Sequence, residues 1–181
     1  MTRISPEQFR NAFLQVVSAT QAECLARWDT RRPYTAHMRE TILPGIAPVL
    51  GVQVCAWDYY TLDCVYFAER DTESFGPQSN YAKCFSVVVE HENDISGTAV
   101  EMNKLQLFNA PLKVLITYAD TETQRAYYLE CYARIVRESD IFGDFTTLRR
   151  QLVIFGSRDD CNAYWHFYTF EEDGFRELKV A

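Results

Sequence analysis

Residues 112–118 (LKVLITY) are the part of the sequence that most constrains the fold. A short run that is apolar at almost every position is typical of a strand covered on both faces by other elements. Residues 83–92 form a second strand-like segment with its apolar centre at 85–89, and a helix-like segment at 98–108 separates the two. This order predicts an α/β (α+β) fold, in which a mixed β-sheet is flanked by helices.

The N-terminal part of the chain is predicted to be helical. A capping box at residues 5–8 (SPEQ) places a proline at the first helical position, and apolar residues at helical spacing continue to Trp28. A second short helix is expected over 35–43, where Pro44-Gly45 follows as a stop signal.

Further elements follow from apolar patterning. Thr98 and Glu101 have the spacing of another capping box, and Asp120 or Thr121 is expected to cap a long helix. Residues 69–81 are expected to be a loop. The predicted strands are 49–57, 62–68, 83–92, 112–118, 152–155, 164–170 and, after a hairpin turn, 175–180.

Length and composition exclude several protein classes. The 181 residues predict a single domain, 1–181, and a content of 48% hydrophobic residues excludes a disordered chain. The N-terminus lacks the layout of a signal peptide, and no run approaches the ~20 apolar residues of a membrane helix. The six cysteines include no CxxC pair. We therefore expect reduced, mostly buried thiols in a cytoplasmic protein without a membrane partner.

The charge is negative and unevenly distributed. The formal net charge is −7, which argues against broad non-specific binding of nucleic acid. Residues 51–130 carry five basic and twelve acidic side chains, a balance of 5 − 12 = −7. A metal site and a solvated acidic face both explain such a concentration.

Three acidic residues occur where strands are predicted. Asp63 interrupts an apolar strand, and Glu90 and Glu92 lie two positions apart, so their side chains share one face of their strand. Burial of carboxylates without a cation is costly. If Asp63 lies on the adjacent strand, three carboxylates converge, and such oxygen ligands suit Mg²⁺ or Mn²⁺. On the following helix Lys104 is placed to lean over Glu90.

This order of elements and acids resembles the restriction-endonuclease-like, PD-(D/E)XK, nuclease superfamily. In that family a helix precedes a meander of strands, with an Asp on the second strand, an acid-x-Lys on the third, and then a helix and a further strand. The resemblance covers a core of about 35–120, to which an N-terminal helix and C-terminal strands are added. Glu92 stands where the family usually has Lys, and Leu62 replaces the proline before the first acid.

The resemblance implies metal-dependent phosphodiester hydrolysis on nucleic acid. Asp63 and Glu90 would hold Mg²⁺ or Mn²⁺, with Glu92 as a further ligand or water-positioning group, and Lys104 would orient water or stabilise the transition state. The alternative is a catalytically inactive protein of the same fold that binds a protein partner. Each residue also has a non-catalytic interpretation. Asp63 is then an acidic residue of a turn or an edge strand, and Glu90 and Glu92 line the solvent-facing side of their strand. Lys104 is then a surface lysine paired with Glu101.

Other candidate residues carry weaker signals. Glu40 is a candidate to reach the acidic cluster from the early helix, but a solvated helix residue is the plainer interpretation. His91 points away from Glu90, and His37 has too few partners for a metal site. The aromatic strand 164–170 has the composition of a core or a partner interface as well as of a base-stacking surface. Motifs of nucleotide-binding loops, serine hydrolases and zinc proteases are missing from the sequence.

Overall fold

A computed structural model describes residues 3–55, 59–74, 80–139, 150–172 and 174–179. Its helices are α1 (Pro6–Ala19), α2 (Gln21–Arg27), α3 (Arg31–His37), α4 (Leu43–Leu50), α5 (Thr98–Gln106) and α6 (Glu122–Ser139), with a π-helical segment η1 (Met38–Ile42) and the 3-10 turns η2 (Glu69–Asp71) and η3 (Ile95–Gly97). Its strands are β1 (Gln53–Cys55), β2 (Cys64–Phe67), β3 (Thr72–Ser74), β4 (Asn80–Ala82), β5 (Val87–His91), β6 (Leu112–Tyr118), β7 (Gln151–Arg158), β8 (Ala163–Glu171) and β9 (Gly174–Glu177).

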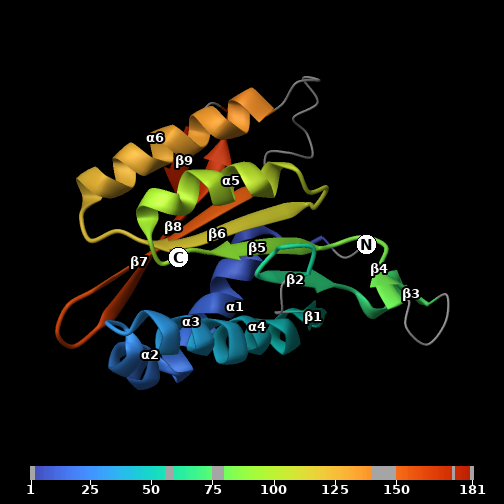
Figure 1. Ribbon diagram of the computed structural model, residues 1–181, viewed down its shortest axis with the longest axis horizontal. Helices are drawn as coiled ribbons and strands as arrows, with labels where there is room; N and C mark the ends of the chain where they lie inside the picture. The colour runs from blue at the N-terminus through green and yellow to red at the C-terminus, as the bar shows by residue number, and fades with distance from the viewer. Residues whose placement is uncertain (1–2, 56–58, 75–79, 140–149, 173, 180–181) are drawn as a thin grey trace.

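Seven of these strands form one mixed sheet in the order β1-β2-β5-β6-β7-β8-β9. The central strands β5, β6 and β7 are parallel, whereas β1, β2, β8 and β9 pair with their neighbours in antiparallel fashion. Strands β3 and β4 form a separate two-stranded ribbon that projects from one side of the molecule (Figure 1). The predicted mixed sheet flanked by helices is therefore confirmed.

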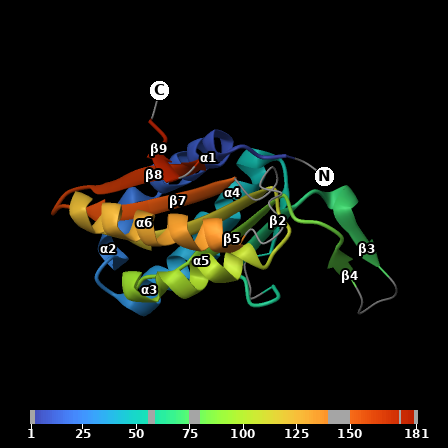
Figure 2. The same cartoon turned by 90° about the horizontal axis from the view of Figure 1, so that it is seen from above.

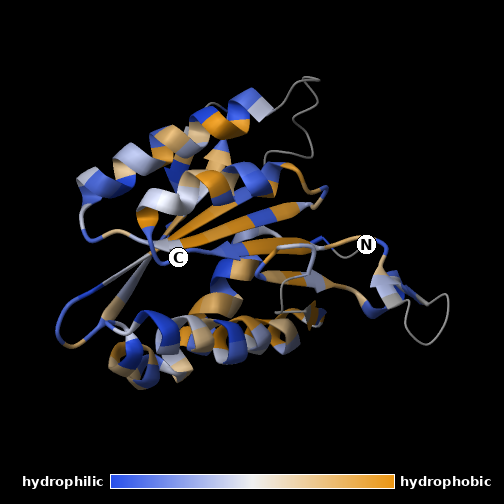
Figure 3. Cartoon of the chain, viewed as in Figure 1, coloured by the Kyte–Doolittle hydropathy of each residue, from blue (hydrophilic) through white to orange (hydrophobic). Residues whose placement is uncertain are grey.

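Helices cover both faces of the sheet, as Figures 1 and 2 show. Helices α1 to α4 pack on one face, where the alternate residues Val114 and Ile116 of β6 join Phe13 and Ile42 in one core. Helices α5 and α6 cover the other face, where Leu115 joins the second core. The strands are apolar through the middle of the molecule and polar side chains concentrate on the helices (Figure 3). This two-sided burial explains the continuous apolar run of β6.

The helical layer differs from its prediction in two places. The expected N-terminal helix is divided at Thr20, the C-cap of α1, whose hydroxyl donates a hydrogen bond to the carbonyl of Val16 (3.1 Å). The expected stop at Pro44-Gly45 is wrong, because the chain continues as α4 to a left-handed C-cap at Gly51 (φ 66°). Gly45 instead permits close packing, since a Cβ there would lie 2.9 Å from Val16 Cγ1.

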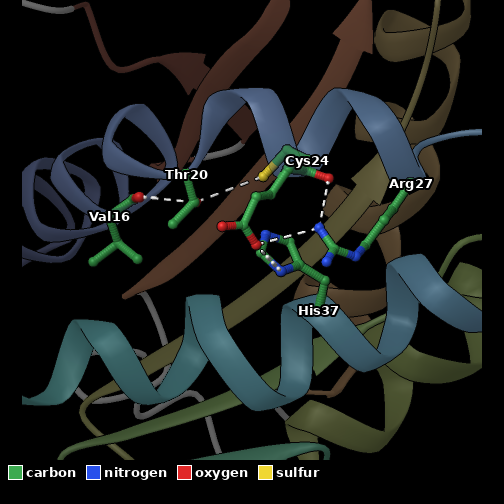
Figure 4. A network of polar contacts seen from close by, with 6 residues as sticks. Val16, Thr20, Cys24, Arg27 and His37 are labelled. Atoms are coloured by element: carbon green, nitrogen blue, oxygen red, sulfur yellow. Dashed lines mark hydrogen bonds and ion pairs between the residues drawn. The ribbon is translucent and has the colours of Figure 1, made fainter.

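A small polar network joins α2 to α3 (Figure 4). Arg27 donates to the carbonyl of Glu23 at 3.1 Å and to its carboxylate at 3.2 Å, one helical turn earlier. The buried His37 of α3 places Nδ1 3.9 Å from the Glu23 carboxylate, and burial lowers the pKa of His37. The network orients the two short helices rather than forming a ligand site.

Other expectations are confirmed, corrected or outside the described part. The capping box of Ser5 and Gln8 is present, and Thr121 accepts a hydrogen bond from the Gln124 backbone at the start of α6.

The predicted loop 69–81 contains η2, β3 and the start of β4, and residues 56–58 of the strand expected at 49–57 lie outside the described residues. None of the five cysteines whose side chains are described forms a disulfide, and only two of them are buried, so the expectation of mostly buried thiols is wrong. Among the described residues no helix has the length and apolar character to cross a membrane.

We predict that Gly156→Ala destabilises the fold by roughly 1–3 kcal/mol, the usual cost of overpacking a core. A Cβ at this position of β7 would lie 2.7 Å from Tyr118 Cδ1 and 2.9 Å from Trp165 Cζ3. The matched control is Gly174→Ala, because nothing lies within 4 Å of its Cβ position. Urea denaturation followed by circular dichroism measures both, and equal midpoints for the two variants would contradict the packing.

Candidate active site

Two acidic side chains from adjacent strands meet beneath helix α5. Asp63 directly precedes β2, and Glu90 lies in β5; the register that pairs Cys64 with Val89 places the two acids side by side. The two carboxyl groups lie close enough to influence each other's pKa, and Asp63 Oδ2 accepts the backbone N–H of His91 at 2.8 Å. The strand alternation that places Val88 in the second core turns Glu90 toward the same side.

Lys104 of α5 supplies the positive charge at this pair. Its Nζ lies 2.9 Å from Glu90 Oε1 and 2.5 Å from Glu101 Oε2, and it donates to the carbonyl of Thr61 at 3.1 Å. One ammonium group therefore connects a helix, a central strand and the turn before β2. The side chain of Lys104 is 25% exposed, so the site retains a path to solvent on this side.

Burial controls the protonation of the carboxyl groups. Glu90 is only 1% exposed, and desolvation raises its pKa to about 9 even though Lys104 acts to lower it. Desolvation also raises the pKa of Asp63, against the lowering effects of its hydrogen bonds and of Lys104. Desolvation acts to lower the pKa of Lys104, but the carboxyl groups of Glu101 and Glu90 together raise it above its ordinary value. At neutral pH the carboxyl group of Glu90 therefore holds a proton beside the charged Lys104.

The turn before Asp63 has an uncommon backbone. Tyr60 and Thr61 both have positive φ, 53° and 71°, and Tyr59 and Leu62 close the turn. A β-branched residue such as Thr61 adopts this conformation at a cost, so other contacts must hold it in place. The bond from Lys104 to the Thr61 carbonyl is one such contact, and the ring of Tyr59 is another because its hydroxyl accepts the Ala82 N–H at 3.0 Å.

The structure does not bring Glu92 to the acidic pair. β5 ends at His91, and Glu92 Oε1 accepts the backbone N–H of Asp94 at 2.7 Å while its carboxyl rests against Gly97. The expected convergence of Asp63, Glu90 and Glu92 is therefore not seen. Among the described residues no group of three His, Cys, Asp or Glu side chains is arranged to hold a metal ion.

The other expected residues also have definite places. His91 packs on the opposite face, as predicted, where its Nε2 lies 2.7 Å from the Tyr118 hydroxyl. Glu40 is exposed on η1, and no contact in the described part of the chain joins it to the acidic pair. The expected capping box at α5 is wrong: Thr98 bonds to the Ile95 carbonyl and to the Tyr132 hydroxyl, which leaves Glu101 free to pair with Lys104.

A second lysine was missed because it lies inside the apolar run of β6. Lys113 is 1% exposed, and its Nζ lies 3.4 Å from both the backbone carbonyl and the side-chain Oε1 of Gln106, at the C-terminus of α5. Burial lowers the pKa of Lys113 to about 8. A cation at this end of the helix donates hydrogen bonds to the terminal carbonyl groups and interacts favourably with the negative end of the helix dipole. Its contacts indicate a structural role.

The remaining carboxylate pair, Asp63 and Glu90, has the chemistry to hold a divalent ion. Oxygen ligands suit Mg²⁺, which commonly uses one or two carboxylates and completes its shell with water and substrate phosphate. Glu90 Oε1 is buried and, apart from the ammonium of Lys104, makes no hydrogen bond of standard geometry. Asp63 and Glu90 therefore fit such an ion, whereas Glu92 contributes no ligand in this arrangement.

Comparison of the chain with protein-family models, with curated proteins and with solved structures finds no match. The function must accordingly be argued from the site itself.

We predict that Glu90→Gln becomes progressively more stable relative to the wild type as the pH rises from 5 to 9. The folded protein holds a proton on Glu90 up to about pH 9, whereas the ordinary pKa is 4.5. The folded state then binds more protons than the unfolded state, so wild-type stability falls with rising pH across this window, by at most about 1.4 kcal/mol per pH unit. A glutamine side chain does not titrate in this range, so the variant does not lose this stability as the pH rises.

Urea unfolding at pH 5, 7 and 9 measures the effect. Glu130→Gln is the matched control, because Glu130 is exposed on α6 and changes the net charge equally. If the two variants show the same dependence on pH relative to the wild type, burial does not govern the protonation of Glu90.

Proposed function

We propose that the protein is a divalent-metal-dependent nuclease that hydrolyses phosphodiester bonds. The observation that carries the proposal is the placement of Asp63 and Glu90 side by side on adjacent strands, with the Lys104 ammonium 2.9 Å from Glu90. Two carboxylates and a lysine in one partly accessible site are the groups needed to hold an ion and to stabilise a phosphate in the transition state.

The order of the elements supports the same proposal. Helices precede β1 and β2, Asp63 adjoins β2, Glu90 lies on the next strand of the sheet, and α5 and β6 follow. This is the order expected for the restriction-endonuclease-like, PD-(D/E)XK, superfamily. The lysine expected two residues after the second acid would then be supplied from α5 by Lys104, which reaches the pair across the sheet face.

Asp63 and Glu90 would hold the metal, Mg²⁺ or Mn²⁺. A bound ion of this kind lowers the pKa of water and neutralises charge on a phosphate. The chain itself contributes position and charge. The backbone N–H of His91 fixes the carboxylate of Asp63, and Glu101 together with the Thr61 carbonyl holds the ammonium of Lys104 in place. Lys104 thereby offers N–H donors to a phosphate oxygen or to the attacking water.

One observation favours a second candidate function, that of a non-catalytic protein-binding member of the same fold. Glu90 is almost fully buried and already paired with Lys104, so the acidic pair is compensated without a metal. A protein that uses the fold only as a scaffold needs no more than this. The two functions differ in whether the pair binds a cation, and two experiments decide between them.

The first experiment measures cleavage. We expect the purified protein to cleave single- or double-stranded nucleic acid with Mg²⁺ or Mn²⁺ and not with chelator. Asp63→Ala and Lys104→Met should each reduce the rate by at least roughly 100-fold, the usual scale for loss of a metal ligand or an electrostatic donor. Glu92→Gln is the matched control, because Glu92 bonds to Asp94 instead of the pair, and it should retain most activity. Cleavage that persists in Asp63→Ala would come from another source.

The second experiment measures metal binding without activity. Millimolar Mg²⁺ or Mn²⁺ should raise the melting temperature of the wild type, since a ligand that binds only the folded state stabilises it. Asp63→Asn and Glu90→Gln should respond less, and in chelator both should melt at or above the wild-type temperature, because an amide occupies the buried site without the cost of holding a carboxyl proton at neutral pH. Identical melts of all three proteins in metal and in chelator would favour the non-catalytic function.

A further inference from the structure

A pocket of about 400 Å³ lies at the C-terminal ends of the parallel strands β5 and β6. Residues after these strands meet residues of α2, α3 and the start of α6 at its walls. Crevices at the carboxyl ends of parallel strands are the usual ligand positions of open α/β sheets, and this volume is within the range of small-molecule sites. The lining residues used below are Trp28, Asp29, Arg31, Tyr34, Asp94, Tyr118 and Asp120.

The inner wall of the pocket is aromatic and pre-formed. Trp28 packs edge-on against Tyr34 and Tyr118 with ring centroids 5.2 Å from each, and Tyr34 and Tyr118 are 5.4 Å apart. His91 contacts Tyr118 from behind, and Gly156 lies close against its ring. These rings belong to the core on the face opposite Glu90, so the wall is rigid and distinct from the acidic pair.

The wall includes one buried hydroxyl group. The hydroxyl of Tyr34 is buried and makes no hydrogen bond of standard geometry among the described residues, although it lies near enough to Tyr118 to influence its pKa. Tyr34 lines the pocket.

The rim of the pocket carries more acidic than basic side chains. Asp29, Asp94 and Asp120 line it together with the guanidinium of Arg31, and Arg158 adds a second guanidinium beside Asp29. Both Asp29 oxygens lie 2.7 Å from Arg158, and Arg31 lies 3.5 Å from Asp94.

Asp120 differs from the other two carboxylates. In the described part of the chain its carboxylate has no ion-pair or hydrogen-bond partner, since only its backbone N–H is bonded, to Gln124. The rim therefore favours positive charge and disfavours phosphate.

We propose that this pocket binds a small organic cation, an amine or guanidinium attached to a flat or aliphatic body. The ammonium group would pair with Asp120 at the rim and lie against the electron-rich rings of Trp28 and Tyr118, and the body would fill the aromatic wall. The site is separate from the acidic pair and does not depend on the nuclease proposal.

The first test uses a matched pair of probes of nearly the same shape, phenethylamine and the uncharged 2-phenylethanol, with adenosine monophosphate as an anionic probe. Isothermal titration calorimetry and tryptophan fluorescence report binding, because Trp28 lines the pocket and Trp165 packs against it with a centroid distance of 5.8 Å. Phenethylamine should bind roughly tenfold or more tightly than the alcohol. Equal binding of the two, preference for the nucleotide, or no binding of the amine at millimolar concentration would overturn the proposal.

The second test changes the rim. Asp120→Asn should weaken phenethylamine binding roughly tenfold, whereas Glu130→Gln, the same change of net charge farther along α6, should leave it unchanged. Both residues are exposed, so both variants should fold as the wild type does, which circular dichroism checks. If the two variants bind the amine alike, Asp120 is not its counter-ion and the proposal fails.

Discussion

The ammonium of Lys104 is the charge on which the arrangement of the acidic face depends. An ionised or even a protonated carboxyl group inside an apolar layer is costly unless polar partners surround it. Lys104 meets Glu90, Glu101 and the Thr61 carbonyl at once, so it joins α5 to β5 and to the turn that places Asp63. Without it, Glu90 would lose its cation and the turn one of its contacts.

Much of the fold follows from local patterns in the sequence. The bounds of β6 match the apolar run 112–118 because both faces of that strand are buried, and the start of α1 matches its capping box because Ser5 and Gln8 bond locally. Tertiary packing decides the places where prediction failed. Pro44-Gly45 reads as a stop, yet close contact with α1 makes the glycine useful inside a continuing helix.

The site shows the same division. Alternation along a strand was sufficient to place Glu90 and His91 on opposite faces, and strand order was sufficient to bring Asp63 beside Glu90. The position of Glu92 was not predictable in this way, because β5 ends one residue earlier and the chain turns into η3. The positive φ of Tyr60 and Thr61 was also not predictable from the sequence. Glycine or asparagine at these positions would have indicated it, because these residues adopt positive φ readily.

The lengths of the outermost strands have a consequence for self-association. As described, β1 has three residues and β9 has four, so each outermost strand presents a short row of backbone groups, although residues 163–166 of β8 extend beyond β9. Short edges are poor templates for the addition of a strand from another chain, which is the usual route to sheet extension and amyloid-like aggregation. Apolar surface is found instead in the α5 region, where Val100 and Leu107 are 69% and 79% exposed.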